Sequence, residues 1–286
     1  MHSFEAVESQ YLKKLLSINY PFLNEIQIKS IFNQKDIKVN GKRVKENILI
    51  NKNDNIEVYY DFEKFLSNLI EIVYQDDNIL IINKPIGIET VSEDKNRLTL
   101  EQYLLTKFPF AKAVHRLDLN TKGLLMFALN ADAENELLNA IRSHNIYKTY
   151  KTIVYTKNAI KNEKYIDYIS SDKIRQTSKI CAKNKGKIAI LEILSCTKIN
   201  NDLSLLDIKL YTGRMHQIRV QLANHKIYVL GDGKYGDKVI NRKYKTNTQL
   251  LQATKLEFNF SSDSILHYLN EKKFEIDFKY NLNFNN

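Results

Sequence analysis

The chain has 286 residues and a formal net charge of +10, and 43% of its residues are hydrophobic, with 17 Tyr and 13 Phe. This apolar content excludes intrinsic disorder and suffices for one large domain or for a catalytic domain with a small accessory one. The two cysteines exclude a disulfide framework, and neither lies in a CxxC pair or a Cys/His cluster of zinc-binding spacing. The opening MHSFEAVESQ lacks the apolar core of a signal peptide, and no stretch reaches about 18 apolar residues, so we expect a cytoplasmic protein with no membrane partner.

Positive charge is concentrated in two segments of the chain. Residues 142–190 carry 12 Lys or Arg against three acids, and residues 209–246 carry nine against two. Scattered lysines usually form a solvated surface, whereas such concentrations favour a polyanionic partner, of which nucleic acid is the commonest.

The first 60 residues predict a small α+β unit. The string QYLKKLLS has leucines at helical spacing, and a second helix is predicted from Asn24, its N-cap, with Ile26 among the inward residues. Asn40-Gly41 then separates two runs of alternating apolar residues, which indicates a hairpin because both turn positions need positive φ. The string NIEVYY closes the unit as a strand.

This N-terminal stretch resembles the αL-type RNA-binding domain first seen in a ribosomal protein. The resemblance rests on the strings LKKLLS, IQIKSIFNQKDIKVNGKRVKEN and NKNDNIEV. It implies that basic side chains of the second helix and the hairpin contact RNA phosphates, namely Lys29, Lys42, Arg43 and Lys45. An accessory domain without this role is the alternative, because a fold alone seldom determines function.

The segment after this unit, 61–70, is predicted to be a linker or a joining helix. Residues 71–85 contain two short β runs around Asp76-Asp77-Asn78.

Further on, the polar turn 115–122 leads into the unbroken apolar run 124–129. Such a run predicts a strand covered on both faces, with a short helix as the alternative. A turn attached to a buried strand is a rigid support for reactive side chains.

Four segments occur in the order typical of one enzyme family. They are IVYQDDNILIINKPIGIETV (72–91), HRLDLNTKGLLMFALN (115–130), IYKTYKTIV (146–154) and YTGRMHQIRVQLANHKIYVLGDGKYGD (211–237), followed by LLQATKLEFNF (250–260). Together they resemble the RluA-type ribosomal large-subunit pseudouridine synthases. The resemblance implies an α+β fold with a large, mostly antiparallel mixed sheet and flanking helices. It also divides the chain into an RNA-binding domain (1–62), a linker (63–70) and a catalytic domain (71–286).

The resemblance assigns the chemistry to three residues. Asp118 matches the family's catalytic carboxylate, which could attack C1′ of the sugar, attack C6 of the base or abstract a sugar proton. Burial would favour its protonated form, so a cation is needed nearby, and Arg219 matches the family's partner. Arg219 is predicted on a helix with Thr212 as a possible N-cap. Tyr150, in the family's Lys-x-Tyr motif, implies a ring that stacks on a flipped-out base.

Further residues at family positions are expected to shape the catalytic loop or to bind RNA: Lys84, His115, Arg116, Thr121, Lys148, Arg214, His216 and Gln217. Lys122, four residues after Asp118, stands where the family commonly has Ser and is expected to contact RNA near the flipped base. Lys122, Met215, Gln221, Leu129 and Gln252 depart from the family's usual residues, which affects the expected target nucleotide rather than the expected activity. His115 and His216 lack an acid or Cys at the spacing of metal ligands, so we predict no metal site. The resemblance implies no cofactor.

The sequence predicts an enzyme that isomerises uridine to pseudouridine in structured RNA, with large-subunit ribosomal RNA as the expected substrate. Alternatives are a transfer-RNA pseudouridine synthase of the same family and a non-catalytic RNA-binding assembly factor. A glycosidase-like enzyme is more distant, because no second catalytic carboxylate is marked. We expect a monomer that needs no protein partner; the sequence does not identify the modified uridine or the route taken by Asp118.

Overall fold

The computed structural model describes residues 1–94, 97–172 and 174–280. The N-terminal part has a four-stranded sheet of order β1-β6-β3-β4, made of β1 (His2–Glu5), β3 (Ile37–Val39), β4 (Lys42–Arg43) and β6 (Asn55–Val58). A two-stranded sheet pairs β2 (Gln10–Tyr11) with β5 (Leu49–Ile50), and helices α1 (Leu12–Asn19) and α2 (Glu25–Asn33) complete this part. Its apolar side chains form a cluster of their own.

Local signals in this part give the expected elements, with one exception. Asn24 caps α2 in a capping box with Gln27, and Asn40 and Gly41 both have positive φ between β3 and β4. Ile28 is buried as predicted, but Ile26 is 77% exposed, so its predicted inward orientation is wrong. Ile26 lies in the first turn of the helix, on the side away from the core cluster.

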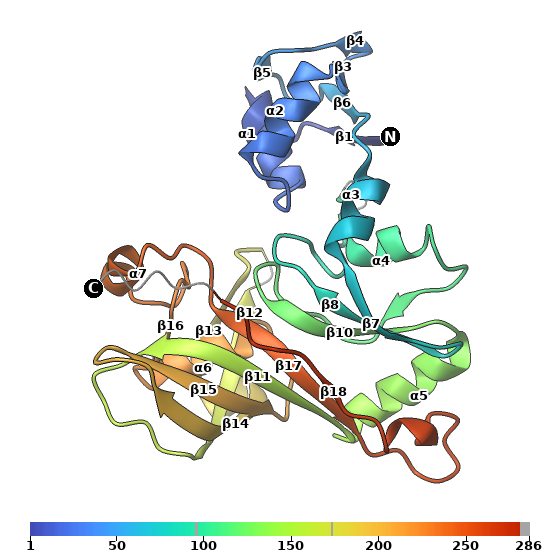
Figure 1. Cartoon of the computed structure of the whole chain (residues 1–286). Helices are drawn as coiled ribbons and strands as arrows, with labels where there is room; N and C mark the ends of the chain where they lie inside the picture. The colour runs from blue at the N-terminus through green and yellow to red at the C-terminus, as the bar shows by residue number, and fades with distance from the viewer. Residues whose placement is uncertain (95–96, 173, 281–286) are drawn as a thin grey trace.

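The segment predicted as a linker or joining helix is helix α3 (Phe62–Leu69). Asp61 caps it by accepting a hydrogen bond from the Lys64 amide. Phe62 packs in the N-terminal cluster, whereas Leu66 packs in the core of the larger part. The helix therefore joins two cores, and Figure 1 shows it between the N-terminal part and the rest of the chain.

The rest of the chain is organised around a 12-stranded sheet with the main order β13-β12-β14-β15-β11-β17-β10-β8-β7. These strands are β7 (Glu71–Gln75), β8 (Ile79–Lys84), β10 (Lys122–Ala128), β11 (Ile146–Tyr155), β12 (Lys164–Asp172), β13 (Thr177–Ile180), β14 (Lys187–Lys198), β15 (Leu203–Leu210) and β17 (Leu251–Phe258). Short strands β9 (Lys112–Ala113), β16 (Tyr228–Val229) and β18 (Phe274–Glu275) pair with β10, β11 and β17. Of the pairings between described strands, β10 with β17 is parallel and the others are antiparallel, which confirms the predicted mostly antiparallel mixed sheet.

Helices lie beside this sheet: α4 (Leu100–Leu104), α5 (Ala131–Arg142), α6 (Gln217–Asn224) and α7 (Lys238–Lys243), with 3-10 turns at Lys183–Lys185 and His267–Leu269. The apolar run after the polar turn is β10, as predicted. Leu125 and Phe127 point into one core cluster, and Leu124 and Met126 into another on the opposite face. Both faces of the strand are therefore covered, which explains why its sequence does not alternate.

Candidate functional site

The polar turn before β10 is held through its backbone. Leu119 O accepts hydrogen bonds from the Lys84 ammonium at 3.1 Å and from the Gly87 amide at 2.9 Å. On the other side, the Leu117 amide donates to Thr90 Oγ1 at 3.3 Å, and the Thr121 amide donates to Asp118 O at 3.0 Å. These bonds fix the position of Asp118 without using its side-chain carboxylate.

Asp118 and Arg219 meet as predicted, although 101 residues separate them in sequence. Arg219 Nη1 donates to Asp118 Oδ2 at 2.9 Å; the arginine side chain is 7% exposed and the aspartate side chain 22%. Arg219 lies on α6, which packs against β12, β13 and β16. The site therefore combines a partly accessible carboxylate with a nearly buried guanidinium.

Asp232 is a member of this site that sequence reasoning missed. Arg219 Nε and Nη2 donate to its two carboxylate oxygens at 2.7 and 2.9 Å, in the planar bidentate arrangement typical of such pairs. The backbone amides of Lys234 and Tyr235 add two further hydrogen bonds. Arg219 and these amides together hold the pKa of Asp232 below its usual value in spite of burial. The string LGDGKYGD was part of the recognised segment, but nothing local marks Asp232 as the partner of a residue on α6.

The predicted start of α6 is wrong. The helix begins at Gln217, and its N-cap is His216 with φ of 56°, not Thr212. The Thr212 hydroxyl is instead occupied by the Ile190 amide, which donates to it at 2.8 Å, and by Gln217 Oε1, to which it donates. A helix from Thr212 would lose the bond to Ile190 on β14.

His216 lies beside the carboxylate of Asp118. Its Nδ1 is 2.9 Å from the Tyr235 hydroxyl, and its Nε2 is 3.9 Å from Asp118 Oδ2. Burial lowers the pKa of His216, and the nearby charge of Asp118 only partly offsets this. The imidazole is therefore predominantly neutral at neutral pH and does not compete with Arg219 as a counterion.

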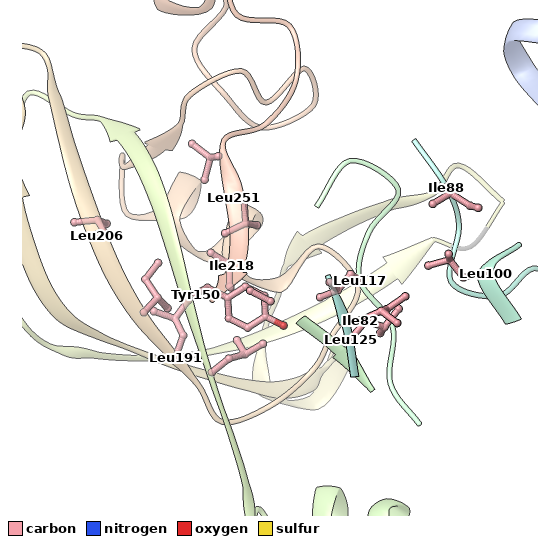
Figure 2. Packing of buried hydrophobic residues seen from close by; sticks show 14 of the residues in the cluster. Ile82, Ile88, Leu100, Leu117, Leu125, Tyr150, Leu191, Leu206, Ile218 and Leu251 are labelled. Atoms are coloured by element: carbon pink, nitrogen blue, oxygen red, sulfur yellow. The ribbon is translucent and has the colours of Figure 1, made fainter. Parts of the chain in front are cut away.

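Tyr150 is 5% exposed and belongs to the main core cluster. Figure 2 shows its ring among Leu191, Ile218 and Leu251. Burial and the charge of Asp118 both raise the pKa of its hydroxyl, so the phenol is neutral. The ring is a wall of the region next to Asp118, not an exposed platform.

The predicted RNA contacts fall into two groups. Those with exposed side chains are Lys29, Lys42, Arg43, Lys45 and Arg116. The others are buried or partly buried.

Three predicted RNA contacts are buried, and for them the prediction is corrected. Lys84 has no exposed surface and donates to Pro85 O and Leu119 O, and burial lowers its pKa to about 7. Thr121 accepts a hydrogen bond from Gln249 Nε2 at 2.7 Å. Gln217 bonds to Thr212, Arg214 and Ile190. The polar groups of these three side chains are hydrogen-bonded within the protein, which fits the other expected role, shaping the loops around Asp118 and Arg219.

Other predicted contacts are oriented differently from expectation. The Lys122 ammonium lies 3.7 Å from the centre of the Tyr280 ring and donates to Lys279 O, so it faces the C-terminal segment rather than RNA near Asp118. His115 Nε2 accepts a hydrogen bond from the Met126 amide, and burial and Lys148 lower its pKa well below the usual value. Burial also lowers the pKa of Lys148, to about 8. Arg214 Nε donates to Ile188 O at 2.9 Å.

Within residues 1–94, 97–172 and 174–280, no group of three or more His, Cys, Asp or Glu side chains is arranged to hold a metal ion. Within the same ranges, no helix combines the length and apolar character needed to cross a membrane.

Comparison with known proteins agrees with this geometry. The family model described as RNA pseudouridylate synthase matches residues 78–224. Ribosomal large subunit pseudouridine synthase C of Rickettsia conorii is 33% identical over 81% of this chain and 82% of that protein. Ribosomal large subunit pseudouridine synthase D of Buchnera aphidicola is 30% identical over 90% of this chain and 83% of that protein.

The fold is also found in a solved structure. The structure of the human protein named RNA Pseudouridylate Synthase Domain Containing 4 superposes on this one with a TM-score of 0.59 and 19% sequence identity. The superposition covers 76% of this chain and 90% of the human chain. The family and the fold predicted from the four sequence segments are thereby confirmed. This chain belongs to the RNA pseudouridylate synthase family and is an RNA pseudouridine synthase, an isomerase.

Proposed function

We propose that this enzyme isomerises uridines in large-subunit ribosomal RNA and that Asp118 is its catalytic carboxylate. The observation that carries the proposal is the pairing of Asp118 with Arg219 at 2.9 Å on a rigid turn. Arg219 places a positive charge directly beside the carboxylate that would act on each of the three routes. The names of the Rickettsia and Buchnera relatives support the ribosomal substrate.

The uridine is flipped out of its helix and bound between Asp118 and the wall that contains Tyr150. The Tyr150 ring is 5% exposed in the free protein, so the proposed stack on the base requires this wall to open when the RNA binds. A stacked aromatic face then contributes roughly 1–3 kcal/mol, which helps to offset the few kcal/mol of unstacking. Leu117 and Ile218, the chain neighbours of Asp118 and Arg219, lie in the same core cluster as Tyr150, which supports the closeness of Tyr150 to the site.

The RNA around the uridine is bound by exposed cations. Arg116 lies two residues from Asp118 and has an exposed side chain, which suits a phosphate contact beside the reacting nucleotide. The N-terminal domain (1–62), joined by 63–70 to the catalytic domain (71–286), adds Lys29, Lys42, Arg43 and Lys45 as auxiliary contacts. The enzyme acts as a cytoplasmic monomer on this substrate.

The test is a chemical map of pseudouridine in ribosomal and transfer RNA from a deletion strain. The strain is complemented with wild type or with Asp118→Asn, which keeps the shape of the side chain and removes its charge. Sites in large-subunit RNA that only wild type restores are the expected result. Restoration by both proteins would refute the role of Asp118, and sites confined to transfer RNA would show the alternative substrate. Restoration of no site by either protein would favour a non-catalytic RNA-binding factor.

A further inference from the structure

Asp232 is bound to Arg219 more completely than Asp118 is. Its side chain has no exposed surface, and it accepts two hydrogen bonds from the guanidinium and two from backbone amides. Asp118 accepts a single hydrogen bond from Arg219 and is 22% exposed. One guanidinium is therefore shared by two carboxylates, of which only one can reach a substrate.

The proposed reaction removes the charge of the accessible carboxylate. Attack at C1′ forms an ester bond to Asp118 while the electron pair of the C1′–N1 bond leaves with uracil. Attack at C6 forms an ester bond and moves the C5–C6 π pair onto the base. Abstraction of the C2′ proton converts Asp118 into a carboxylic acid. The electron pair of the C2′–H bond forms a C1′–C2′ double bond, and the electron pair of the C1′–N1 bond leaves with uracil. On every route Asp118 becomes neutral and the negative charge moves to the base.

Arg219 would then be a nearly buried cation beside a neutral Asp118. Such a charge is costly unless a second anion remains in contact with it. In the part of the chain that the structure describes, the carboxylates in ion-pair contact with Arg219 are Asp118 and Asp232. Asp232 is the carboxylate that remains in contact.

We infer that Asp232 is a positioning residue that serves as the permanent counterion of Arg219, so that Asp118 can lose its charge during the reaction. The bidentate contact also keeps Nη1 directed at the position of Asp118 when the hydrogen bond between them weakens. This inference rests on the proposed role of Asp118, but its electrostatic part can be tested without turnover.

The first test is kinetic. In Asp232→Asn, the amide cannot accept two hydrogen bonds from Arg219, and its charge is lost. Under single-turnover conditions we expect a fall in rate on the order of 100-fold, as for loss of a preorganised electrostatic group, with the Kd for the same RNA unchanged. Asp207→Asn, which removes a carboxylate paired with Lys151 at 2.7 Å on β15, should keep the wild-type rate. A wild-type rate in Asp232→Asn would overturn the inference.

The second test is a double-mutant cycle on stability, measured as urea midpoints. Asp118→Asn imitates the neutral state, and its midpoint should stay close to that of wild type because Asp232 still neutralises Arg219. The double variant leaves Arg219 without an anion, so its midpoint should fall by more than the two single shifts together. Additive shifts of the urea midpoint would overturn the inference. A large fall of the midpoint in Asp118→Asn alone would also overturn it, and this variant remains measurable if Asp232→Asn fails to fold. If wild type made no pseudouridine, the proposed function would fail, whereas this cycle would still test the counterion.

Discussion

Gly123 lies at the start of β10, directly after the polar turn that holds Asp118, and Gly123→Ala should disrupt both the strand and the turn. Gly123 has φ of 114° and pairs with Ala253 in the parallel β10–β17 ladder. A Cβ at this position would lie 2.1 Å from Ala253 O and 2.7 Å from Ala253 N. Since real Cβ atoms stay at least 3.0 Å from such neighbours, the two strands must separate by nearly 1 Å.

The cost can be assembled from two contributions. Positive φ costs a residue with a Cβ about 1–2 kcal/mol. Loss of one or two ladder hydrogen bonds adds about 1 kcal/mol each. We therefore expect Gly123→Ala to lower the free energy of unfolding by about 3 kcal/mol. A shift of nearly 1 Å in the support of Asp118 should also reduce activity about 100-fold.

The chain contains no Trp, so far-UV circular dichroism during urea unfolding is the suitable assay. Gly213→Ala is the matched control, because a Cβ there meets nothing within 4 Å. Its free energy of unfolding should stay within about 1 kcal/mol of wild type. Equal midpoints for the two variants would show that the β10–β17 contact is not the constraint described here.

Three further predictions concern the cations around the site. Arg219→Lys cannot contact both carboxylates with a planar fork, so the single-turnover rate should fall at least tenfold; an unchanged rate would refute this geometry. Lys84 has its pKa lowered from 10.5 to about 7, so between these pH values the folded state binds fewer protons than the unfolded one and stability rises with pH. Urea midpoints from pH 7 to 9 should therefore rise more steeply in wild type than in Lys84→Met, and identical slopes would contradict this. Lys122→Met should lower the free energy of unfolding by about 1 kcal/mol through loss of the Tyr280 contact, with unchanged RNA affinity in filter binding.

Features that depend on neighbouring residues could be predicted from the sequence. Asn24 caps α2, Asn40-Gly41 forms the hairpin turn, and the run 124–129 gives a strand covered on both faces. Each follows from the chemistry of a few adjacent side chains. The pairing of Asp118 with Arg219 was also predicted, but through the family resemblance and not through any local rule.

The features that escaped prediction depend on contacts between distant segments. Lys84 looks like a surface cation in sequence, but the carbonyl of Leu119, 35 positions later, binds its ammonium in the core. Thr212 is an acceptable N-cap by residue type, but the Ile190 amide on β14 occupies its hydroxyl. Asp232 acquires its role only because the fold places it against Arg219. Residue type sets what a side chain can bind, and the tertiary structure decides which partner it meets.

The central position of β17 determines when the site can form during synthesis of the chain. Strands β7, β8 and β10 make one half of the large sheet and β11 to β15 the other, and β17 is the strand between them. Asp118 belongs to the first half, whereas Tyr150 and Arg219 belong to the second. A nascent chain that ends before residue 251 holds two half-sheets with unpaired edges, which a chaperone or another strand can cover. Activity should therefore appear only after residues 251–258 have left the ribosome, however early the catalytic turn itself has folded.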